Sequence, residues 1–405
     1  MTTRMTTRMT RRAVQVLCLL MAMSLLSGCW SRRELNELSL TMGIGLDKIG
    51  DQYTLSVEVI NPEAMSEKGS GSAVGIYREE GRSILECLRR LTTRVPRYLY
   101  MAHLRIMVIG EELAREGIAQ VLDFFMRDNE LRSDFYVIVA KNDTASDILQ
   151  FPTQLERIPA NKLYNSLENS GKQWSPAEGI HLDELVSNLT SHGAKNAVLP
   201  GIEVSPNLPL KAGLANEANL AAQSLKYSGI GIFQGDKLIG WLNEDESRAI
   251  NYVRKRVKRS MGQVKCGSDG VVSLKTDYNR VKLKAKIIQG KPHIAINLDL
   301  EGTIGEVQCG IDLMRVKEIR KIEEEAEMSM NQLIKHTVQQ VQQKYKSDIF
   351  GFGQAFHHQQ RQYWHRVKKN WNSIFPMVEI DVYTTYKIKG METENSTFIR
   401  DMEQE

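Results

Sequence analysis

A lipobox-like stretch, LSGC at residues 26–29, divides this chain into a short leading segment and everything that can fold behind it. An aliphatic residue and two small residues precede Cys29, whose thiol is the group that takes a diacylglycerol thioether. Small residues there let an extended backbone enter a peptidase groove. The stretch predicts a mature chain that begins at Cys29 and is held at a membrane by that residue.

The leading segment has the parts of a secretory signal. Its first twelve residues hold four arginines and no acid, and residues 13–26 are apolar except for Gln15 and Ser24. This run is shorter than the ~20 residues that a membrane-spanning helix needs. We therefore predict a lipoprotein signal peptide at residues 1–28. The alternative is an uncleaved membrane anchor, which the abrupt end of the run at the lipobox disfavours.

The charge of the chain depends on that segment. The whole chain has 53 Lys+Arg against 49 Asp+Glu, and residues 1–28 hold four Arg, so the predicted mature chain has 49 of each. A nucleic-acid-binding domain carries a net basic charge, which this mature chain lacks. The balance excludes that class of partner.

The spacing of the cysteines does not predict a disulfide framework or a metal site. Cys18 lies in the predicted signal peptide and Cys29 at the lipobox, which leaves Cys87, Cys266 and Cys309 without CxxC or Cys/His spacing. The pattern indicates neither a zinc site nor a set of disulfides. Cys266 and Cys309 could pair across a sheet, but buried free thiols are the favoured interpretation.

The first half alternates strands with helices. We predict strands at residues 40–46, 53–60, 73–78, 104–109 and 135–140, and helices after Ser83, at 111–127 and at 144–149. In residues 53–60 apolar residues alternate with Thr54, Ser56 and Glu58, as in a half-buried hairpin. Such alternation predicts a mixed sheet covered by helices.

The second half has a different pattern. We predict hairpins at residues 225–241 and 281–300, a helix capped by Asn243, a long helix from Asp312 to about Tyr345, and a last strand at 377–388. The fold class is therefore α+β, with a mixed-sheet N-terminal region followed by an antiparallel-sheet C-terminal domain that a long helix braces.

The predicted boundaries follow from composition. We expect an N-terminal α/β region at residues 29–204 that can hold two subdomains, a linker at 205–224, a C-terminal domain at 225–390 and a disordered acidic tail at 391–405.

No stretch carries a catalytic signature. Gly43/Gly45 and Gly229/Gly231 resemble parts of phosphate loops, but each pair lacks the third glycine and the following helix, which favours turns and close strand packing. His357, His358 and His365 have no acidic neighbours to complete a metal shell, so an exposed helix face is the better interpretation. No nucleophile elbow or HExxH motif is present.

Two aromatic residues lie seven positions apart. Trp364 and Trp371 would share one face of a helix. Such a stripe usually belongs to a core, and contact with a partner is the alternative. Arg32 and Arg33, beside the predicted lipid, could meet headgroups or a partner, or belong to a solvated tether.

Several blocks, in this order, resemble one family. They are CWSRRELNEL from Cys29, NPE from Asn61, YLYMAHL from Tyr98 with VIGEE from Val108, RDNELR from Arg127, GIGIF from Gly229 with GWL from Gly240 and ESR from Glu246, and DIFGFG from Asp348 with Trp364 and Trp371. The chain resembles the Ger(x)C spore germination lipoproteins, the C subunits of nutrient germinant receptors. Ser31, where the family often has Asp, and Pro96 depart from the pattern.

The resemblance implies a non-enzymatic role without a cofactor. It implies a lipid-anchored subunit on the outer face of the spore inner membrane, beside a membrane subunit of A type and a transporter-like subunit of B type. It also implies Cys29 as the lipidated residue. Trp30, Arg32, Arg33, His103, Trp364 and Trp371 are the candidate partner contacts.

Two other classes fit the predicted compartment. A solute-binding lipoprotein that delivers a nutrient to a transporter would have a similar length, but it has two similar α/β lobes, whereas the second half here indicates antiparallel strands and one long helix. A cell-wall hydrolase has only the compartment in its favour.

Overall fold

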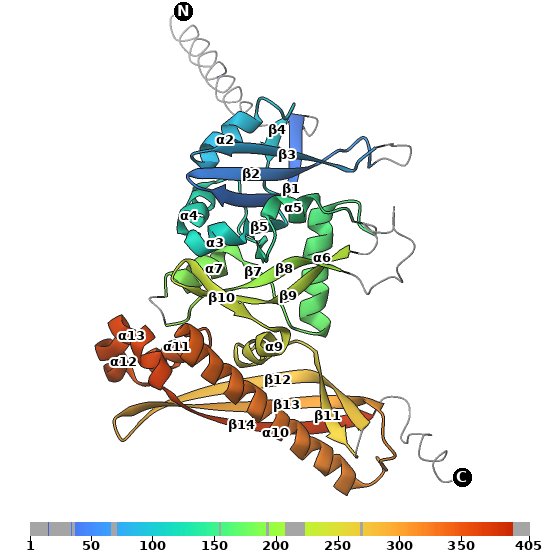
Figure 1. Cartoon of the computed structure of the whole chain (residues 1–405), viewed down its shortest axis with the longest axis vertical. Coiled ribbons are helices and arrows are strands. Elements are labelled where there is room, and N and C mark those ends of the chain that lie inside the picture. The colour runs from blue at the N-terminus through green and yellow to red at the C-terminus, as the bar shows by residue number, and fades with distance from the viewer. Residues whose placement is uncertain are drawn as a thin grey trace, which may run out of the picture.

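The computed structural model describes residues 37–65, 71–153, 155–191, 194–206, 223–267 and 270–391, together with Gln15 and Glu34. Most of the predicted signal peptide, Cys29, residues 207–222 of the predicted linker and residues 392–405 of the predicted tail lie outside the described residues. Figure 1 shows two sheets arranged along the long axis of the molecule, with α9 between them.

The first sheet has ten strands in the order β10-β9-β8-β6-β5-β1-β2-β3, with β4 added beside β1 and β7 beside β6. The strands are β1 (Leu38–Ile49), β2 (Gln52–Ile60), β3 (Val74–Gly81), β4 (Tyr98–Tyr100), β5 (Ile106–Gly110), β6 (Tyr136–Ala140), β7 (Ile180–His181), β8 (Val198–Pro206), β9 (Gln223–Gln234) and β10 (Lys237–Leu242). The centre is parallel from β1 through β5 and β6 to β8, and both flanks are antiparallel. The predicted mixed sheet is confirmed.

Helices cover both faces of this sheet. They are α2 (Ile84–Leu91), α3 (Glu111–Glu116), α4 (Ala119–Arg127), α5 (Ala145–Gln150), α6 (Pro159–Gln173) and α7 (Leu182–Leu189). The apolar residues of α2, α3, α4 and α7 belong to one core cluster, and those of α5 and α6 to another. Alternate residues of β5 and β6 divide between the clusters, so these strands are buried on both sides, as continuous apolar runs predict.

The prediction of a half-buried hairpin at β2 was wrong. Thr54, Ser56 and Glu58 are buried along with the apolar residues between them, because α5 and α6 cover the face predicted to meet solvent. The Glu58 carboxylate accepts the backbone N–H of Ala160, at the start of α6, at 3.1 and 3.3 Å. Burial raises the pKa of Glu58 to about 7.

The second sheet has the order β11-β12-β13-β14. Its strands are β11 (Ser260–Cys266), β12 (Gly270–Ile288), β13 (Lys291–Val307) and β14 (Glu379–Met391). The first three pair antiparallel, as predicted, but β14 runs parallel to β13. A parallel neighbour requires a crossover connection, and the helices between β13 and β14 supply it.

Helices also bind the edge strand β14 and the part of β12 that β11 does not cover. Along the β14 edge, Glu323 and Glu327 of α10 (Val316–Gln340) accept the N–H groups of Ile388 and Tyr386, each at 2.9 Å. Along the β12 edge, Gln359 at the end of α11 (Phe352–Gln359) accepts the N–H of Ala285 at 2.9 Å and donates to the carbonyl of Leu283 at 2.8 Å. These side chains replace missing neighbour strands.

The crossover helices are shorter than predicted. The α-helical part of the long helix is α10, about 38 Å at 1.5 Å per residue, and it ends in a π turn at Val341–Tyr345. The expected single helix around Trp364 and Trp371 is instead α11, α12 (Arg361–Val367) and α13 (Trp371–Ile374), with short 3-10 turns after α12 and α13. The helix that Asn243 caps is α9 (Glu244–Val253), as predicted.

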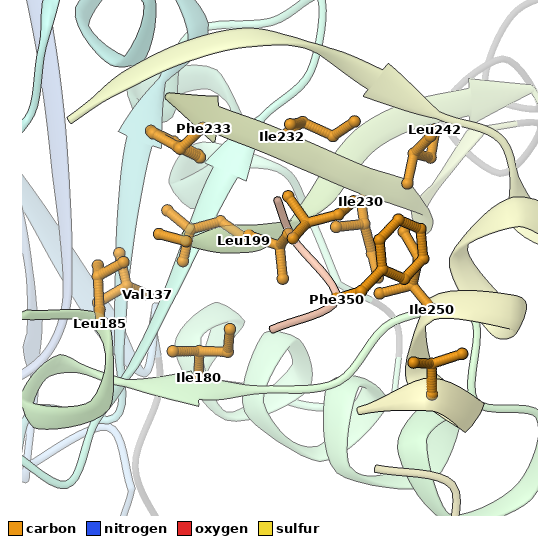
Figure 2. Packing of buried hydrophobic residues seen from close by; sticks show 14 of the residues in the cluster. Val137, Ile180, Leu185, Leu199, Ile230, Ile232, Phe233, Leu242, Ile250 and Phe350 are labelled. Carbon is orange, nitrogen blue, oxygen red and sulfur yellow. The ribbon is translucent and has the colours of Figure 1, made fainter. Parts of the chain in front are cut away.

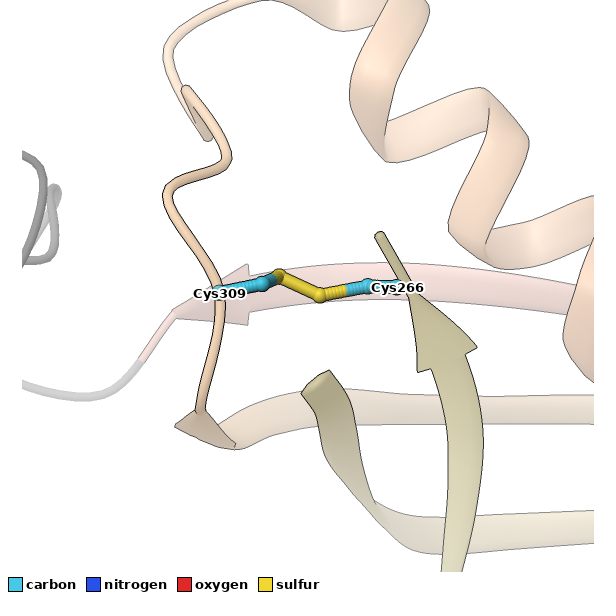
Figure 3. Close-up of a disulfide and its surroundings, with 2 residues drawn as sticks. All are labelled: Cys266 and Cys309. Carbon is cyan, nitrogen blue, oxygen red and sulfur yellow. A yellow bond between two sulfur atoms is a disulfide. The ribbon is translucent and has the colours of Figure 1, made fainter. Parts of the chain in front are cut away.

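The interpretation of Cys266 and Cys309 as free thiols was wrong. The two residues form a disulfide with their Cα atoms 6.3 Å apart (Figure 3). Cys266 ends β11 and Cys309 follows β13, so the ladder through β12 brings them together. Cys87 is a buried free thiol.

The first sheet extends beyond the predicted linker. Strands β9 and β10, placed by sequence at the start of the C-terminal domain, belong to the first sheet, because β9 pairs with β8 and β10 pairs with β9. The predicted domain boundaries stay predictions. The two sheets differ in strand number, order and helix cover, unlike the two similar lobes of a solute-binding protein. Among the described residues, no helix is both long enough and apolar enough to cross a bilayer.

The pKa of Glu58 makes stability depend on pH. Because this pKa, about 7, exceeds the ordinary value of 4.5, the native carboxyl binds its proton more tightly than the unfolded one. The contribution of Glu58 to the free energy of unfolding should therefore fall by about 3 kcal/mol as pH rises through this interval, and then level off.

The variant Glu58→Gln should lose that fall, because its amide oxygen can still accept the Ala160 N–H. Urea unfolding over a pH series checks this. Exposed Glu112→Gln is the control and should keep the wild-type profile. An unchanged profile in Glu58→Gln would contradict the assignment.

The disulfide closes a loop of sequence separation 43. On the chain-entropy account, the double variant Cys266→Ser/Cys309→Ser should lose up to about 4 kcal/mol of unfolding free energy. A reducing agent should lower the melting temperature of the wild type and leave that of the double variant unchanged. Equal sensitivity of both proteins to the reductant would contradict the pairing.

Candidate functional site

The candidate site is the junction where residues 345–353 meet the first sheet. The hydroxyl of Tyr345 donates to the carbonyl of Trp241 at 2.8 Å, and the hydroxyl of Ser347 donates to that of Phe233 at 2.8 Å. The backbone N–H of Asn196 donates to the carbonyl of Asp348 at 2.7 Å. The segment after α10 is thus fixed to β9, β10 and the approach to β8.

The carboxylate of Asp348 organises this segment. It is fully buried and accepts five hydrogen bonds of 2.6 to 3.1 Å, from the backbone N–H groups of residues 350–353 and from the indole N–H of Trp371. Burial raises the pKa of Asp348 to about 6, although the donors Gly353, Trp371, Phe352 and Gly351 act in the opposite direction. One side chain therefore shapes the loop and attaches α13 to it.

Two glycines permit this loop. Gly351 has φ +84°, a left-handed conformation that side chains disfavour. A Cβ at Gly353 would lie within 2.9 Å of Trp371, Ala194 and Trp364. The aromatic residues between and after these glycines can therefore pack tightly.

The junction has a continuous apolar core. Figure 2 shows Phe350 beside Ile230 of β9 and Ile250 of α9. These residues belong to a single buried cluster that extends from the first sheet into the second. The two sheets thus share a core rather than being joined only by a linker.

Helix α9 forms a second contact between the halves. Asn251 donates to the carbonyl of Ser175 at 2.7 Å. Arg248 donates to the carbonyl of Met261, on β11, at 2.8 Å, and its guanidinium lies 4.5 Å from the ring centre of Trp174. Helix α9 therefore forms hydrogen bonds both with the segment that follows α6 and with the second sheet.

A group of buried charges surrounds the junction. Arg256 pairs with Glu184 and lies 3.8 Å from Glu178. Burial raises the pKa of Glu178 to about 7, and burial together with nearby Arg254 lowers the pKa of Lys195 to about 8. The guanidinium nitrogens of Arg254 are inaccessible to solvent and have no hydrogen-bond partner among the described residues. Burial thus moves the pKa values of Glu178 and Lys195 toward neutral pH, whereas the pair with Arg256 keeps the pKa of Glu184 below its ordinary value.

A cavity of about 170 Å³ lies beside this group of charges. Its lining includes Glu168, which pairs with Lys172 at 2.7 Å and accepts the hydroxyl of Tyr136. Tyr136 stacks on His181 with ring centres 4.4 Å apart. Much of the lining is therefore occupied by its own interactions.

Trp241 attaches the junction to the parallel centre of the first sheet. Its indole donates to Glu111, at the start of α3, at 3.0 Å. Burial alone would raise the pKa of Glu111, but hydrogen bonds from Asn142, Trp241 and Arg115 together lower it. A continuous set of contacts thus joins α3, β10 and Tyr345.

Five of the sequence blocks, which are far apart along the chain, meet at this junction. The block at Val108 supplies Glu111, that at Gly229 supplies Ile230 and Phe233, and that at Gly240 supplies Trp241. The block at Glu246 lies in α9, and the block at Asp348 is the buried loop itself.

The predicted glycine motifs are packing features. Gly43 and Gly45 lie within β1, where a Cβ would press on Leu149 at 3.0 and 2.9 Å. Gly229 has φ +71° inside β9. Asp47, after the first pair, accepts the N–H groups of Ala145 and Ser146 at the start of α5 at 2.8 and 3.0 Å. The glycines thus lie inside strands rather than in turns, and those at 43 and 45 let helix α5 approach β1 closely.

The histidines lie where the sequence predicted. His357, His358 and His365 are exposed on α11 and α12. Within the described ranges, no group of three or more His, Cys, Asp or Glu side chains could hold a metal ion.

The candidate partner contacts have different environments. His103 is exposed and lies edge-on to Tyr100 with ring centres 5.8 Å apart. Trp364 and Trp371 are buried, so they are core residues in this structure and a partner could not reach them without moving the helices. Cys29, Trp30, Arg32 and Arg33 lie outside the described residues.

Comparison with known families assigns the chain. A model of the spore germination protein N-terminal domain matches residues 31–204, and a model of the spore germination B3/GerAC-like C-terminal domain matches residues 228–392. The chain belongs to the Ger(x)C family. This is the family of germinant-receptor C subunits and not a known enzyme family.

Relatives and a solved structure agree with this assignment. The Ger(x)C chain is 29% identical to spore germination protein KC of Bacillus subtilis over 388 residues, which cover 92% of this chain and 94% of that protein. It is 25% identical to spore germination protein B3 of the same organism over 372 residues, covering 90% and 94%. The crystal structure of the GerBC protein has the same fold, with a TM-score of 0.53, 21% identity, and coverage of 86% of this chain and 97% of that one.

Sequence reasoning missed several residues of the junction in this Ger(x)C chain. The sequence predicts Tyr345 only as the end of a helix and gives no role to Lys195, Arg254 or Glu178. Gly240 was the one sequence feature that could have indicated a close contact here. In the structure a Cβ at this position would collide with the Tyr345 ring.

The Asp348 loop predicts the effect of two substitutions. Asp348→Asn places an amide donor among N–H donors and should lower the free energy of unfolding by about 3 kcal/mol or more. Trp371→Phe removes one donor and some buried surface and should cost about 2 kcal/mol.

The control is Trp364→Phe, which shortens a buried indole that has no hydrogen bond to Asp348. Urea unfolding measures all three. If Trp371→Phe cost no more than Trp364→Phe, the bond to Asp348 would have no stabilising role.

Proposed function

We propose that this chain is a non-enzymatic lipoprotein subunit of a nutrient germinant receptor, where it supports receptor assembly or signalling at the spore inner membrane. The observation that carries the proposal is the convergence of five family blocks, those at Val108, Gly229, Gly240, Glu246 and Asp348, on one junction. These residues form a packed contact between the two sheets rather than an open cleft. Such a contact is suited to keeping the outer surfaces of the two sheets in a fixed relative orientation.

The junction supports a mechanical role for both halves. Buried hydrogen bonds from Tyr345 and Ser347 and a shared apolar core connect the two sheets. A force or displacement applied to one sheet would therefore reach the other through packed elements. The first sheet and second sheet would each offer a separate outer surface to the A-type and transporter-like B-type subunits.

The anchor belongs to the same proposal. Lipidation of Cys29 would hold the chain on the outer face of the membrane, and Trp30, Arg32 and Arg33 would lie beside the headgroups. His103 is the one proposed contact that the described structure leaves exposed.

The anchored role predicts the effect of losing the thiol. Spores whose only copy of this chain carries Cys29→Ala should germinate poorly through this receptor, because the subunit cannot take its lipid, while sporulation stays normal. Germination is measured as the loss of optical density after nutrient addition, and the amount of the chain in spore membranes by immunoblot.

Two strains control this experiment. A Cys87→Ser strain changes a cysteine outside the lipobox, and a strain without the gene gives the zero level. Normal nutrient germination of the Cys29→Ala spores would refute the anchored role. Absence of the A-type and B-type subunits from a pull-down of the wild-type chain would refute the receptor role.

A further inference from the structure

One side of the C-terminal half is strongly basic. Residues 349–378 contain no Asp or Glu. They contain four cations, Arg361, Arg366, Lys368 and Lys369, all of which are exposed on α12 or the turn after it. Three exposed histidines lie in the same segment.

Strand β12 adds a second row of cations. Arg280, Lys282, Lys284 and Lys286 alternate along the strand and are all exposed. Residues that alternate along a strand share one face and lie about 7 Å apart, so the row extends for about 20 Å. The opposite face carries Val281 and Ala285, which are buried.

The two groups border each other. Gln359, at the end of α11, is hydrogen-bonded to Leu283 and Ala285, and Gln360 donates to the carbonyl of Ala285 at 3.2 Å. We call the eight residues of the two groups the basic surface. Figure 1 shows α11 and α12 beside the β12 end of the second sheet.

The basic surface is not neutralised by neighbours. Within the part of the chain that is described, none of its eight side chains forms an ion pair or a hydrogen bond. Nearby acids are engaged elsewhere, since Glu379 pairs with Lys291 at 3.2 Å and Asp381 bonds to His293 at 2.8 Å. Asp299 lies across from Arg280 in the ladder. The predicted mature chain has equal numbers of acidic and basic residues. The excess of positive charge on the basic surface is therefore a local feature and not a property of the whole chain.

We infer that the basic surface binds a membrane surface that contains anionic phospholipid. Charge complementarity favours an anionic occupant, and a row of flexible lysines fits an array of phosphate groups better than a single ligand. One exposed apolar residue continues the row of cations on β12, and a second lies elsewhere in the acid-free segment. Ile288 follows Lys286 and is 45% exposed, and Met377, in the same acid-free segment, is 62% exposed. Cations beside apolar groups suit the headgroup boundary.

The contact would add to the proposed anchor and orient the molecule. Figure 1 places β4 and β1 toward one end of the long axis and β12 toward the other. Engagement at both ends would lay the long axis along the bilayer. The biological meaning rests on the proposed membrane location, but the contact itself can be measured without a lipid anchor.

The test uses the chain from residue 30 onward, which keeps both cores because all of their residues lie after it. Co-sedimentation is measured with vesicles of phosphatidylcholine alone and of phosphatidylcholine with phosphatidylglycerol in equal parts. We expect binding to the anionic vesicles that weakens with salt. The variant Lys282→Gln/Lys284→Gln/Lys286→Gln should bind at least about tenfold more weakly.

The matched control is Lys317→Gln/Arg320→Gln/Lys335→Gln, which removes three exposed cations from α10 and should bind like the wild type. Thermal unfolding confirms that both variants fold. Equal binding to both vesicle types, an equal loss in the control, or capture of an acidic protein without vesicle binding would each overturn the inference. Failure of the Cys29→Ala prediction would leave this result unaffected.

Discussion

The buried carboxylate of Asp348 is the interaction on which the joined structure depends. A carboxylate removed from water is costly unless hydrogen-bond donors surround it, and here the chain itself supplies all five. The same five bonds satisfy the backbone of a tight loop and fix the indole of Trp371. Because Tyr345 and Ser347 precede this loop, its shape also determines how the second sheet meets the first.

Much of the fold was predictable because local patterns dominate it. Strands buried on both faces, such as β5 and β6, appear as apolar runs, and α9 has a complete capping signal at Asn243. The failures concern pairing between distant segments. The direction of β14 and the disulfide depend on which strands become neighbours, and β11 is too short and too polar to predict alone.

The junction was only partly predictable for a related reason. The family blocks identified Trp241, Asp348 and Trp371 as notable residues, but no spacing along the chain indicates that they meet. The charged groups around Arg254 come from distant parts of the chain, since Lys195 and Asp348 are about 150 residues apart. Their pKa values depend on burial that arises only when these parts pack together. Burial also removed Trp364 from the surface where a partner could contact it.

The side-chain hydrogen bonds to β14 and to the part of β12 beyond β11 limit how this protein can associate. Many complexes form by β-augmentation, in which a partner adds a strand to an open edge. Here Gln359 and Gln360 occupy β12, and Glu323 and Glu327 occupy β14. A donor strand would have to displace these side chains at those positions. At these positions recognition is left to the side-chain surface of the sheet, and edge-to-edge stacking of copies is disfavoured.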